Sequence, residues 1–225
     1  MICNPFYKEG NYMDKEFIIK KARPLFYEYG IKDVSLKQIA NECDTTVSLI
    51  TYYFGSKADL AEAVYMQYFN ELVVTIENKY YENKISYDFR SSGIMYVMST
   101  LHLYESDPKA RRFFLEYCDM GLNYVFFEGY DDIYINLDKK IFFTKNTSDR
   151  LDLIAASAHS GSMGLMYAFF SGKIDCTYSQ FVDYALRKRC QMLSLTEKET
   201  KQLTRVTRKL FTMFDYKTKP NFVLE

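Results

Sequence analysis

The sequence predicts an all-α protein in which a small N-terminal three-helix unit is joined by one long helix to a larger helical body. Apolar residues recur at helical spacing along most of the 225 residues, and residues that cap helices stand where these runs begin. Residues 35–60 hold the clearest example, with three helical segments in close succession. No segment competes by alternating polar and apolar residues as a half-buried strand does.

The first of these segments begins after a reciprocal cap. The Ser35 hydroxyl can accept the amide of Gln38 while the Gln38 side chain returns to the Ser35 backbone, so a helix is expected from Leu36. Asp44 should end it, because Asp tolerates the left-handed backbone of a short turn. The apolar face of the segment consists of Leu36, Ile39, Ala40 and Cys43.

The second segment, from Val47 to about Phe54, is expected to be capped by Thr46 and closed by Gly55, and Ser56 should cap a third helix from Lys57. Two helices joined by so short a turn can place the second one in the major groove of DNA. The second helix should turn two side chains inward, Ile50 and Phe54, and four outward, Ser48, Leu49, Tyr52 and Tyr53.

This stretch resembles the N-terminal pattern of the TetR (tetracycline-repressor-like) family of bacterial transcriptional regulators. The resemblance is continuous over roughly residues 15–65, and Pro24 inside the first helix should add a kink. The chain departs from the family pattern at the turn, where Asp44 and Thr45 replace Gly and Val, and at Val47 and Ser48. The matching residues are Ala22, Leu25, Phe26, Gly30, Ser35, Ile39, Ala40, Thr46, Ile50, Tyr53, Phe54, Lys57 and Leu60.

The resemblance implies a homodimeric transcriptional regulator, most often a repressor, that binds a double-stranded DNA operator and responds to a small, largely apolar or aromatic effector. Residues 1–60 would form the DNA-binding domain, and residues 61–225 the helical effector-binding and dimerisation domain. An effector in the body would move the helix that begins at Lys57 and change the separation of the two recognition helices.

Nine residues are candidates for DNA contact. Ser35 and Thr46 are caps first, and Tyr53 can equally pack on the first helix. Lys57 has less structural reason for its place, because a cation at a helix start is mildly unfavourable, and the family uses it on a phosphate. The candidates are Ser35, Lys37, Thr46, Val47, Ser48, Leu49, Tyr52, Tyr53 and Lys57.

The charge of the N-terminal unit limits how it can bind DNA. The chain has a net charge of zero, and residues 1–60 carry eight Lys or Arg against eight Asp or Glu. No Lys or Arg lies between Asn41 and Ser56, so the recognition helix cannot make the bidentate Arg contact with guanine. Phosphate contacts should come from hydroxyls, helix amides and the flanking Lys37 and Lys57, with a shallow salt dependence. Val47 and Leu49 suit thymine methyl groups.

Seven further helices are expected in the body. The first should continue from Lys57 to about Tyr81 and connect the two parts. Asp107 and Pro108 begin one helix, and Thr196 with Glu199 makes a capping box for the last. The expected ranges are 57–81, 87–105, 108–126, 131–143, 149–171, 177–195 and 197–216.

The body should contain both an effector pocket and a dimer interface. Tyr, Phe and Met are abundant, at 21, 18 and 10 residues, and they suit a pocket for a flat or apolar ligand, although most must be plain core. The effector candidates are Tyr96, Phe114, Tyr117, Tyr124, Met163 and Tyr167. Small residues on the helix 149–171 allow close helix packing, which the resemblance assigns to a dimer and which intrachain packing explains as well. The dimer candidates are Ala156, His159, Ser160, Met163, Tyr184 and Arg187.

Other classes of protein are disfavoured. The chain has no apolar run long enough to span a membrane and no secretory signal, so a cytoplasmic protein is expected. No cofactor or metal is expected, because the five cysteines Cys3, Cys43, Cys118, Cys176 and Cys190 form no C-x-x-C pair and read as reduced, mostly buried thiols. An enzyme using His102 and Glu105 is not expected, since a di-iron helical bundle needs Glu-x-x-His twice. A DNA-binding dimer switched by a protein partner or a redox change, without a small-molecule effector, remains the alternative.

Overall fold

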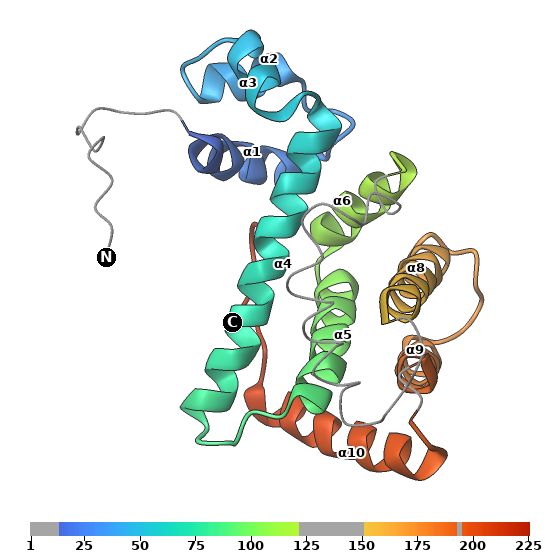
Figure 1. Cartoon of the computed structure of the whole chain (residues 1–225). Helices are drawn as coiled ribbons and strands as arrows, with labels where there is room; N and C mark the ends of the chain where they lie inside the picture. Colours follow the sequence, from blue (N-terminus) through green and yellow to red (C-terminus); the bar gives the residue numbers. More distant parts are fainter. Residues whose placement is uncertain (1–13, 122–150, 193–194) are drawn as a thin grey trace.

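The computed structural model describes residues 14–121, 151–192 and 195–225, and within these ranges the chain is almost entirely helical (Figure 1). The N-terminal unit consists of three helices, and α4 runs from it along the body. The body contains five further described helices and one short hairpin. The elements are α1 Lys15–Tyr29, α2 Leu36–Glu42, α3 Val47–Phe54, α4 Lys57–Glu82, α5 Phe89–Ser106, α6 Pro108–Asp119, α8 Leu151–Phe170, α9 Tyr178–Met192, α10 Glu197–Phe214, β1 Thr218–Lys219 and β2 Val223–Leu224.

The predicted caps of the N-terminal unit are confirmed. Ser35 and Gln38 form the reciprocal capping box of α2, and the Thr46 side chain accepts the amide of Leu49 at the start of α3. Asp44 has a φ of 51° and Gly55 a φ of 78°, so both adopt the left-handed backbone that the turns require. The helix α1 is assigned without interruption through Pro24.

The helix α4 connects the N-terminal unit with the body, as its apolar spacing predicts. Ser56 caps its start, and it ends at Glu82, one residue from the predicted end. Its buried residues recur along one side and pack first against the N-terminal helices and then against α5 and α6. The same helix therefore contributes to both parts. The repeating buried positions are Leu60, Val64, Tyr68, Leu72 and Ile76.

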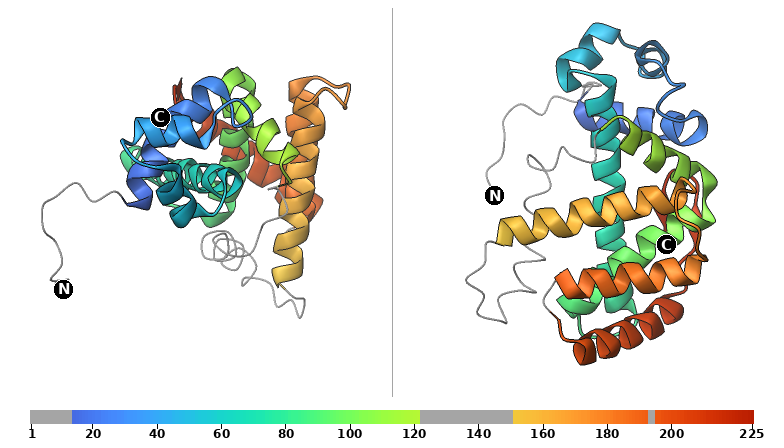
Figure 2. Two further views of the ribbon diagram at one scale, coloured as in Figure 1. Left: turned by 90° about the horizontal axis from the view of Figure 1, so that it is seen from above. Right: turned by 90° about the vertical axis from the view of Figure 1, so that its right-hand side faces the viewer.

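Helix ends in the body differ from the predicted ones where a turn residue intervenes. The helix α6 ends at Asp119 rather than near Phe126, because Met120 and Gly121, with a φ of 77°, close it with backbone bonds to Glu116 and Cys118. The helix predicted over 131–143 lies outside the described residues. The helices α8 and α9 lie side by side on the far side of α5 from α4 (Figures 1 and 2).

The C-terminal hairpin is an element that the sequence analysis missed. β1 and β2 pair antiparallel, with Thr218 opposite Leu224 and Lys219 opposite Val223, and β2 packs on α4. The chain returns along α4 after α10 (Figure 1). Its tip brings Phe222 into the main core, so the C-terminus covers the junction of the N-terminal unit with the body.

Aromatic rings fill most of the core between α4, α5 and α6. The rings of Tyr65 and Tyr117 stack with centroids 4.4 Å apart, and those of Tyr104 and Phe114 stack at 4.6 Å. The hydroxyls of Tyr68 and Tyr104 share a hydrogen bond of 2.7 Å, which satisfies two buried polar groups at once. These contacts connect α4, α5 and α6 in the middle of the body.

Candidate DNA-binding surface and effector cavity

The recognition helix α3 presents a polar, uncharged surface. Tyr52 is 81% exposed, and Ser48 and Val47 are also exposed, while Ile50 is fully buried against the N-terminal core. Leu49 and Tyr53 are half-buried, and Tyr53 packs on the core with its ring edge against Tyr52. The outward surface of α3 therefore includes Val47, Ser48, Thr51 and Tyr52, with Leu49 and Tyr53 at its border.

Lys57 has a structural role that the sequence analysis did not anticipate. Its ammonium donates to the backbone carbonyls of Ile31 (2.7 Å), Lys32 (3.2 Å) and Val34 (2.9 Å), in the loop between α1 and α2. Lys57 therefore has a stronger structural reason for its place than the sequence indicated. A phosphate contact from Lys57 would have to share or replace one of these bonds. Ser35, Lys37 and Thr46 are exposed beside α3.

Two side chains of α6 hold the end of α1. Arg112 donates to the carbonyls of Tyr27 (2.9 Å) and Glu28 (2.8 Å), which α1 leaves without helical partners. Glu116 accepts the amides of Ile31 (2.5 Å) and Lys32 (3.1 Å) in the loop that follows. We call this pair of side chains the α6 clamp. It joins the body directly to the N-terminal unit through hydrogen bonds between charged side chains and the backbone.

Gly30 is required by the α6 clamp. Its φ of 89° lies in the left-handed region, and a Cβ at this position would come within 2.8 Å of the Glu116 carboxylate. Lys32 and Asp119 form an ion pair of 2.7 Å beside it, and Lys109 and Glu28 form another of 2.6 Å. The junction between α1 and α6 thus depends on a residue without a side chain.

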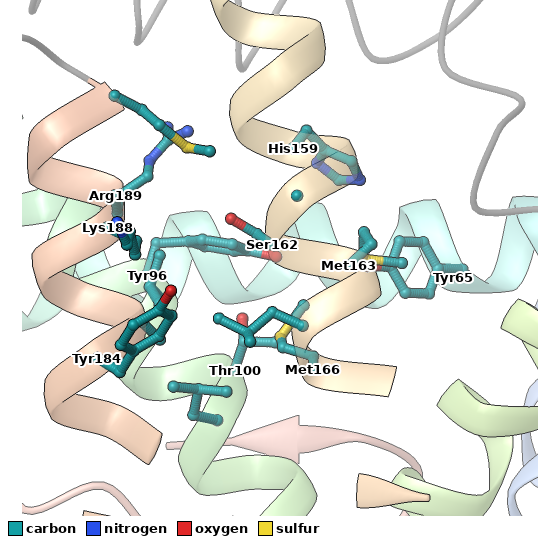
Figure 3. A pocket seen from close by; sticks show the side chains of 16 residues that line it. Tyr65, Tyr96, Thr100, His159, Ser162, Met163, Met166, Tyr184, Lys188 and Arg189 are labelled. Carbon is teal, nitrogen blue, oxygen red and sulfur yellow. Dashed lines mark hydrogen bonds between the residues drawn. The ribbon is translucent and has the colours of Figure 1, made fainter. Parts of the chain in front are cut away.

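A cavity of about 230 Å³ lies in the body between α4, α5, α8 and α9 (Figure 3). Most of its wall is apolar. Arg189 and Lys188 of α9 and His159 of α8 supply nitrogen atoms, and Thr100, Ser162 and the tyrosines supply hydroxyls. The lining residues are Tyr65, Tyr96, Val97, Thr100, Leu101, His159, Gly161, Ser162, Met163, Leu165, Met166, Tyr184, Ala185, Lys188, Arg189 and Met192.

The charged residues in the described wall of this cavity are basic. Burial holds the pKa of His159 well below its ordinary value, and the charge of Arg189 lowers it further, so the imidazole is neutral at pH 7. Arg189 is only 7% exposed, whereas Lys188 is exposed. Among the described residues that line the cavity there is no Asp or Glu.

Residues 18–64 match the family profile described as "Bacterial regulatory proteins, tetR family". These residues carry the DNA-binding domain of the TetR family. The chain is therefore a DNA-binding transcriptional regulator, with α2 and α3 as its helix-turn-helix. A comparison with curated protein sequences finds no match.

One solved structure shares the fold of this chain over most of its length, and two others are less similar. The crystal structure of RolR without ligand has a TM-score of 0.55 at 15% identity, covering 84% of this chain and 96% of that chain. The fatty acid degradation regulator FadR from Bacillus halodurans has a TM-score of 0.46 at 14% identity, covering 83% and 97%. A TetR-family regulator from Streptomyces coelicolor A3 has a TM-score of 0.46 at 13% identity, covering 82% and 99%. At these identities the likeness concerns the fold, and it rests on the first of the three.

The structure places only some of the predicted effector residues at the cavity. Tyr96 and Met163 line the cavity. Phe114 and Tyr117 are not among its lining residues, because their rings stack on Tyr104 and Tyr65 in the core. Tyr167 does not line it either, since its hydroxyl donates to the Asp119 carboxylate at 2.7 Å. Tyr124 lies outside the described residues.

The predicted dimer residues lie on α8 and α9, but not all of them on the outer surface. Ser160, Tyr184 and Arg187 are exposed, and Arg187 lies over the Tyr184 ring at 5.9 Å. Met163 is buried and His159 half-buried, and both line the cavity, as Tyr184 also does. Ala156 lies on α8, in a part of the helix whose side chains are not described.

His102 and Glu105 have separate surroundings. The His102 ring meets Phe211 edge to face at 5.7 Å, and burial lowers its pKa, while Glu105 is ion-paired with Arg111 at 3.9 Å. Over the described residues, no group of three potential metal ligands occurs, and no helix is long and apolar enough to cross a membrane.

The sequence analysis did not identify Arg189 and Thr100 as lining residues of the cavity, nor the α6 clamp at the junction. Arg189 follows Phe181, Val182 and Leu186 on the buried side of α9, so a cation on an apolar helix face was the available signal. Thr100 and the α6 clamp gave no such signal, because their surroundings come from distant parts of the chain.

Proposed function

We propose that the chain is a homodimeric repressor that leaves its operator when a small effector occupies the cavity of the body. Residues 1–60 bind DNA, and residues 61–225 bind the effector and the second copy. The observation that carries this proposal is the outward, uncharged surface of α3 joined through α4 and the α6 clamp to a cavity in the body.

The side chains on the surface of α3 favour hydrogen bonds and apolar contacts with DNA. Contacts between charges, whose strength depends on salt, contribute less. Tyr52 and Ser48 offer hydroxyls, and Val47 offers methyl groups to thymine. Ser35, Lys37 and Thr46 lie beside α3 and suit phosphates, with Leu49, Tyr53 and Lys57 at the border. With few cations in contact, the operator affinity should fall less with salt than that of a strongly basic binder.

The exposed sides of α8 and α9 suit the dimer interface. Small residues on α8, including Ser160, Gly161 and Gly164, are exposed in the single chain, and a second copy could approach them closely. A two-fold dimer would present two α3 helices, which must match half-sites about 34–36 Å apart or a multiple of this distance. An effector that displaces α6 or α4 would change this separation.

The three buried thiols of the described residues do not favour the redox alternative. Burial raises the pKa of Cys118 to about 12 and that of Cys190 to about 11, and burial also raises the pKa of Cys43. These thiols stay protonated at neutral pH and react slowly. A protein partner as the switch has no specific observation in its favour.

The test is DNA binding by the purified full chain. Fluorescence anisotropy with DNA from around its own gene should show specific binding that competitor DNA of unrelated sequence does not displace. Tyr52→Ala should weaken it without loss of stability, because the side chain is exposed. Light scattering should give the mass of a dimer. A monomer, or equal affinity for all sequences at low salt, would rule the proposal out.

A further inference from the structure

We propose that the cavity of the body binds an uncharged ring compound with one carbonyl group, such as a small aromatic ketone, and that the Thr100 hydroxyl donates to that carbonyl. This inference rests on the proposed function, in which the same cavity holds the effector, and it adds the chemical class of that effector. Three features of the cavity support it: its size and apolar walls, the partners of its basic residues, and one buried hydroxyl.

The size and walls of the cavity suit one ring with a short substituent. The cavity measures about 230 Å³. An apolar cavity of about 150 Å³ already holds benzene, so the remaining space suits a substituent of roughly three heavy atoms at about 30 Å³ each. Val97, Leu101 and Met166 offer apolar contact, and Tyr65 and Tyr96 offer rings. The walls therefore favour a mostly apolar ring compound.

The basic residues of the wall interact with other groups of the protein. Arg189 is 7% exposed, and both Arg189 and His159 have interaction partners within the chain. Lys188 is exposed, and its ammonium lies over the Tyr184 ring at 5.5 Å. A charged ligand would lose its hydration in the cavity and would need an opposite charge that is free to pair with it. An uncharged ligand avoids this cost, so the described wall favours one.

Thr100 supplies the buried hydroxyl. It is 4% exposed and lines the cavity from α5, and its Oγ1 has no hydrogen-bond partner among the described residues. A helical threonine can donate to the carbonyl four residues earlier, as Thr51, Thr204 and Thr212 do at 3.0, 2.7 and 3.1 Å. In Figure 3 the Thr100 hydroxyl lies among the lining side chains. Leaving it unsatisfied is costly, and an acceptor on a ligand removes that cost.

A carbonyl oxygen is the acceptor that suits this site. It accepts the hydroxyl proton of Thr100 and brings no donor of its own. A ligand hydroxyl would bring an O–H group that needs a further acceptor in a mostly apolar wall. A ketone therefore leaves no polar hydrogen unsatisfied once this single bond has formed.

The test compares ligands of one shape that differ at one group. Isothermal titration of the full chain uses acetophenone and α-methylstyrene, in which a methylene group replaces the carbonyl oxygen, together with the anion benzoate and the cation benzamidinium. We expect acetophenone to bind roughly threefold to tenfold more tightly than α-methylstyrene, as one hydrogen bond allows. Both ions should bind more weakly than either neutral compound. Three results overturn the proposal: no binding of acetophenone, equally tight binding of α-methylstyrene, or tighter binding of an ion.

Two valine substitutions connect the preference with one hydroxyl. Thr100→Val keeps the shape of the side chain and should reduce the preference for acetophenone over α-methylstyrene to less than about twofold. Thr207→Val is the matched control, because Thr207 of α10 is fully buried, its Oγ1 also lacks a partner among the described residues, and it does not line the cavity. The control should keep the preference of the unaltered chain. Equal preferences in the two variants would contradict the role of Thr100.

Stability measurements separate a ligand contact from a role in the fold. Thr100→Val should not lower the free energy of unfolding, because it removes a buried hydroxyl that has no partner among the described residues. Thr100→Ser retains the hydroxyl and should retain the preference for the ketone. Circular dichroism verifies folding, and should Thr100→Val not fold, Thr100→Ala gives the same comparison. A stability loss in Thr100→Val with an unchanged preference would assign the hydroxyl to the fold and overturn the proposal.

DNA binding is measured separately by anisotropy, so that the two proposals can fail independently. A ketone that binds the cavity and leaves DNA binding unchanged supports the ligand class and contradicts the role of the cavity as effector site. Specific DNA binding with no preference for the ketone overturns the ligand class and leaves the regulator in place.

Discussion

At the scale of single residues, Lys57 shows how a side chain can serve the fold where a ligand contact was expected. Its three hydrogen bonds fix the loop between α1 and α2, whose carbonyls have no strand or helix partner there. This loop carries Ser35, which caps α2 and thereby helps to set the position of α3. Lys57 thus bears on DNA binding through the geometry of the helix-turn-helix, whether or not it meets a phosphate.

Replacing Lys57 with Met should lower the free energy of unfolding by about 1–3 kcal/mol, because three carbonyls lose a charged donor. Urea denaturation followed by circular dichroism measures this. Lys37→Met, at an exposed site on α2, should weaken DNA binding and leave the unfolding free energy almost unchanged. Equal stability of the Lys57 variant and the unaltered chain would contradict the structural role.

Gly30 provides a second prediction at this scale. Gly30→Ala should destabilise the chain by more than about 1 kcal/mol beyond the cost of its left-handed backbone, because the new Cβ would displace the Glu116 carboxylate. Gly172→Ala controls for a positive φ alone, since Gly172 has a φ of 75° and nothing lies within 4 Å of the added atom, whereas Gly30 also has a ψ of 164°. Equal losses in the two variants, measured by thermal unfolding, would refute the role of the α6 clamp.

At the scale of elements, the C-terminal hairpin inserts the Phe222 ring between α1, α4 and α6 where they meet, and in this sense the ring is a wedge. Phe222 is 3% exposed, and its ring lies 5.2 Å from Tyr27, 5.0 Å from Tyr68 and 4.7 Å from Phe113. Its φ of 62° is unusual for a bulky residue, so packing must compensate for backbone strain. Arg23 of α1 also donates to the Asn221 carbonyl at 2.8 Å. One short hairpin thus contacts all three helices at this junction.

Phe222→Ala should cost about 3–5 kcal/mol of stability, as expected for removing a buried aromatic ring. Val223→Ala on the same hairpin removes a half-buried side chain and should cost less. Urea denaturation compares the two. Limited proteolysis should also cleave the N-terminal unit of the Phe222 variant sooner. Similar losses for both variants would show that the ring does not act as a wedge.

At the scale of the whole molecule, the two histidines make stability depend on pH. Burial lowers the pKa of both His102 and His159 from the ordinary value of 6.5. Below pH 6.5 the unfolded chain therefore binds more protons than the folded chain, and protons favour unfolding. Carboxylates with lowered pKa, such as Asp119, act only at lower pH, because their ordinary values lie near 4.

The free energy of unfolding should consequently fall by about 1 kcal/mol or more between pH 7 and pH 5.5. Urea titrations at a series of pH values measure it. The double variant His102→Gln with His159→Gln should lose most of this slope, whatever its absolute stability. A slope that persists unchanged in the double variant would assign the pH dependence to other groups.

The helices and turns of the N-terminal unit could be predicted from local sequence patterns. The caps at Ser35, Thr46 and Ser56, the left-handed Asp44 and the limits of α3 follow from residues only a few positions apart, so the sequence predicted them closely. The spacing of buried residues along α4 is equally local. Such interactions form within one or two turns, and their partners can be identified by counting along the chain.

The sequence by itself determined an all-α chain with a helix-turn-helix and one long connecting helix. Only the tertiary structure decided that Lys57 binds carbonyls, that Phe114 and Tyr117 belong to the core while Thr100 and Arg189 line a cavity, and that Phe222 wedges the junction. The physical reason is separation: these contacts join residues many positions apart, and whether a tyrosine or an arginine meets a ring, a carbonyl or open space depends on how whole helices pack.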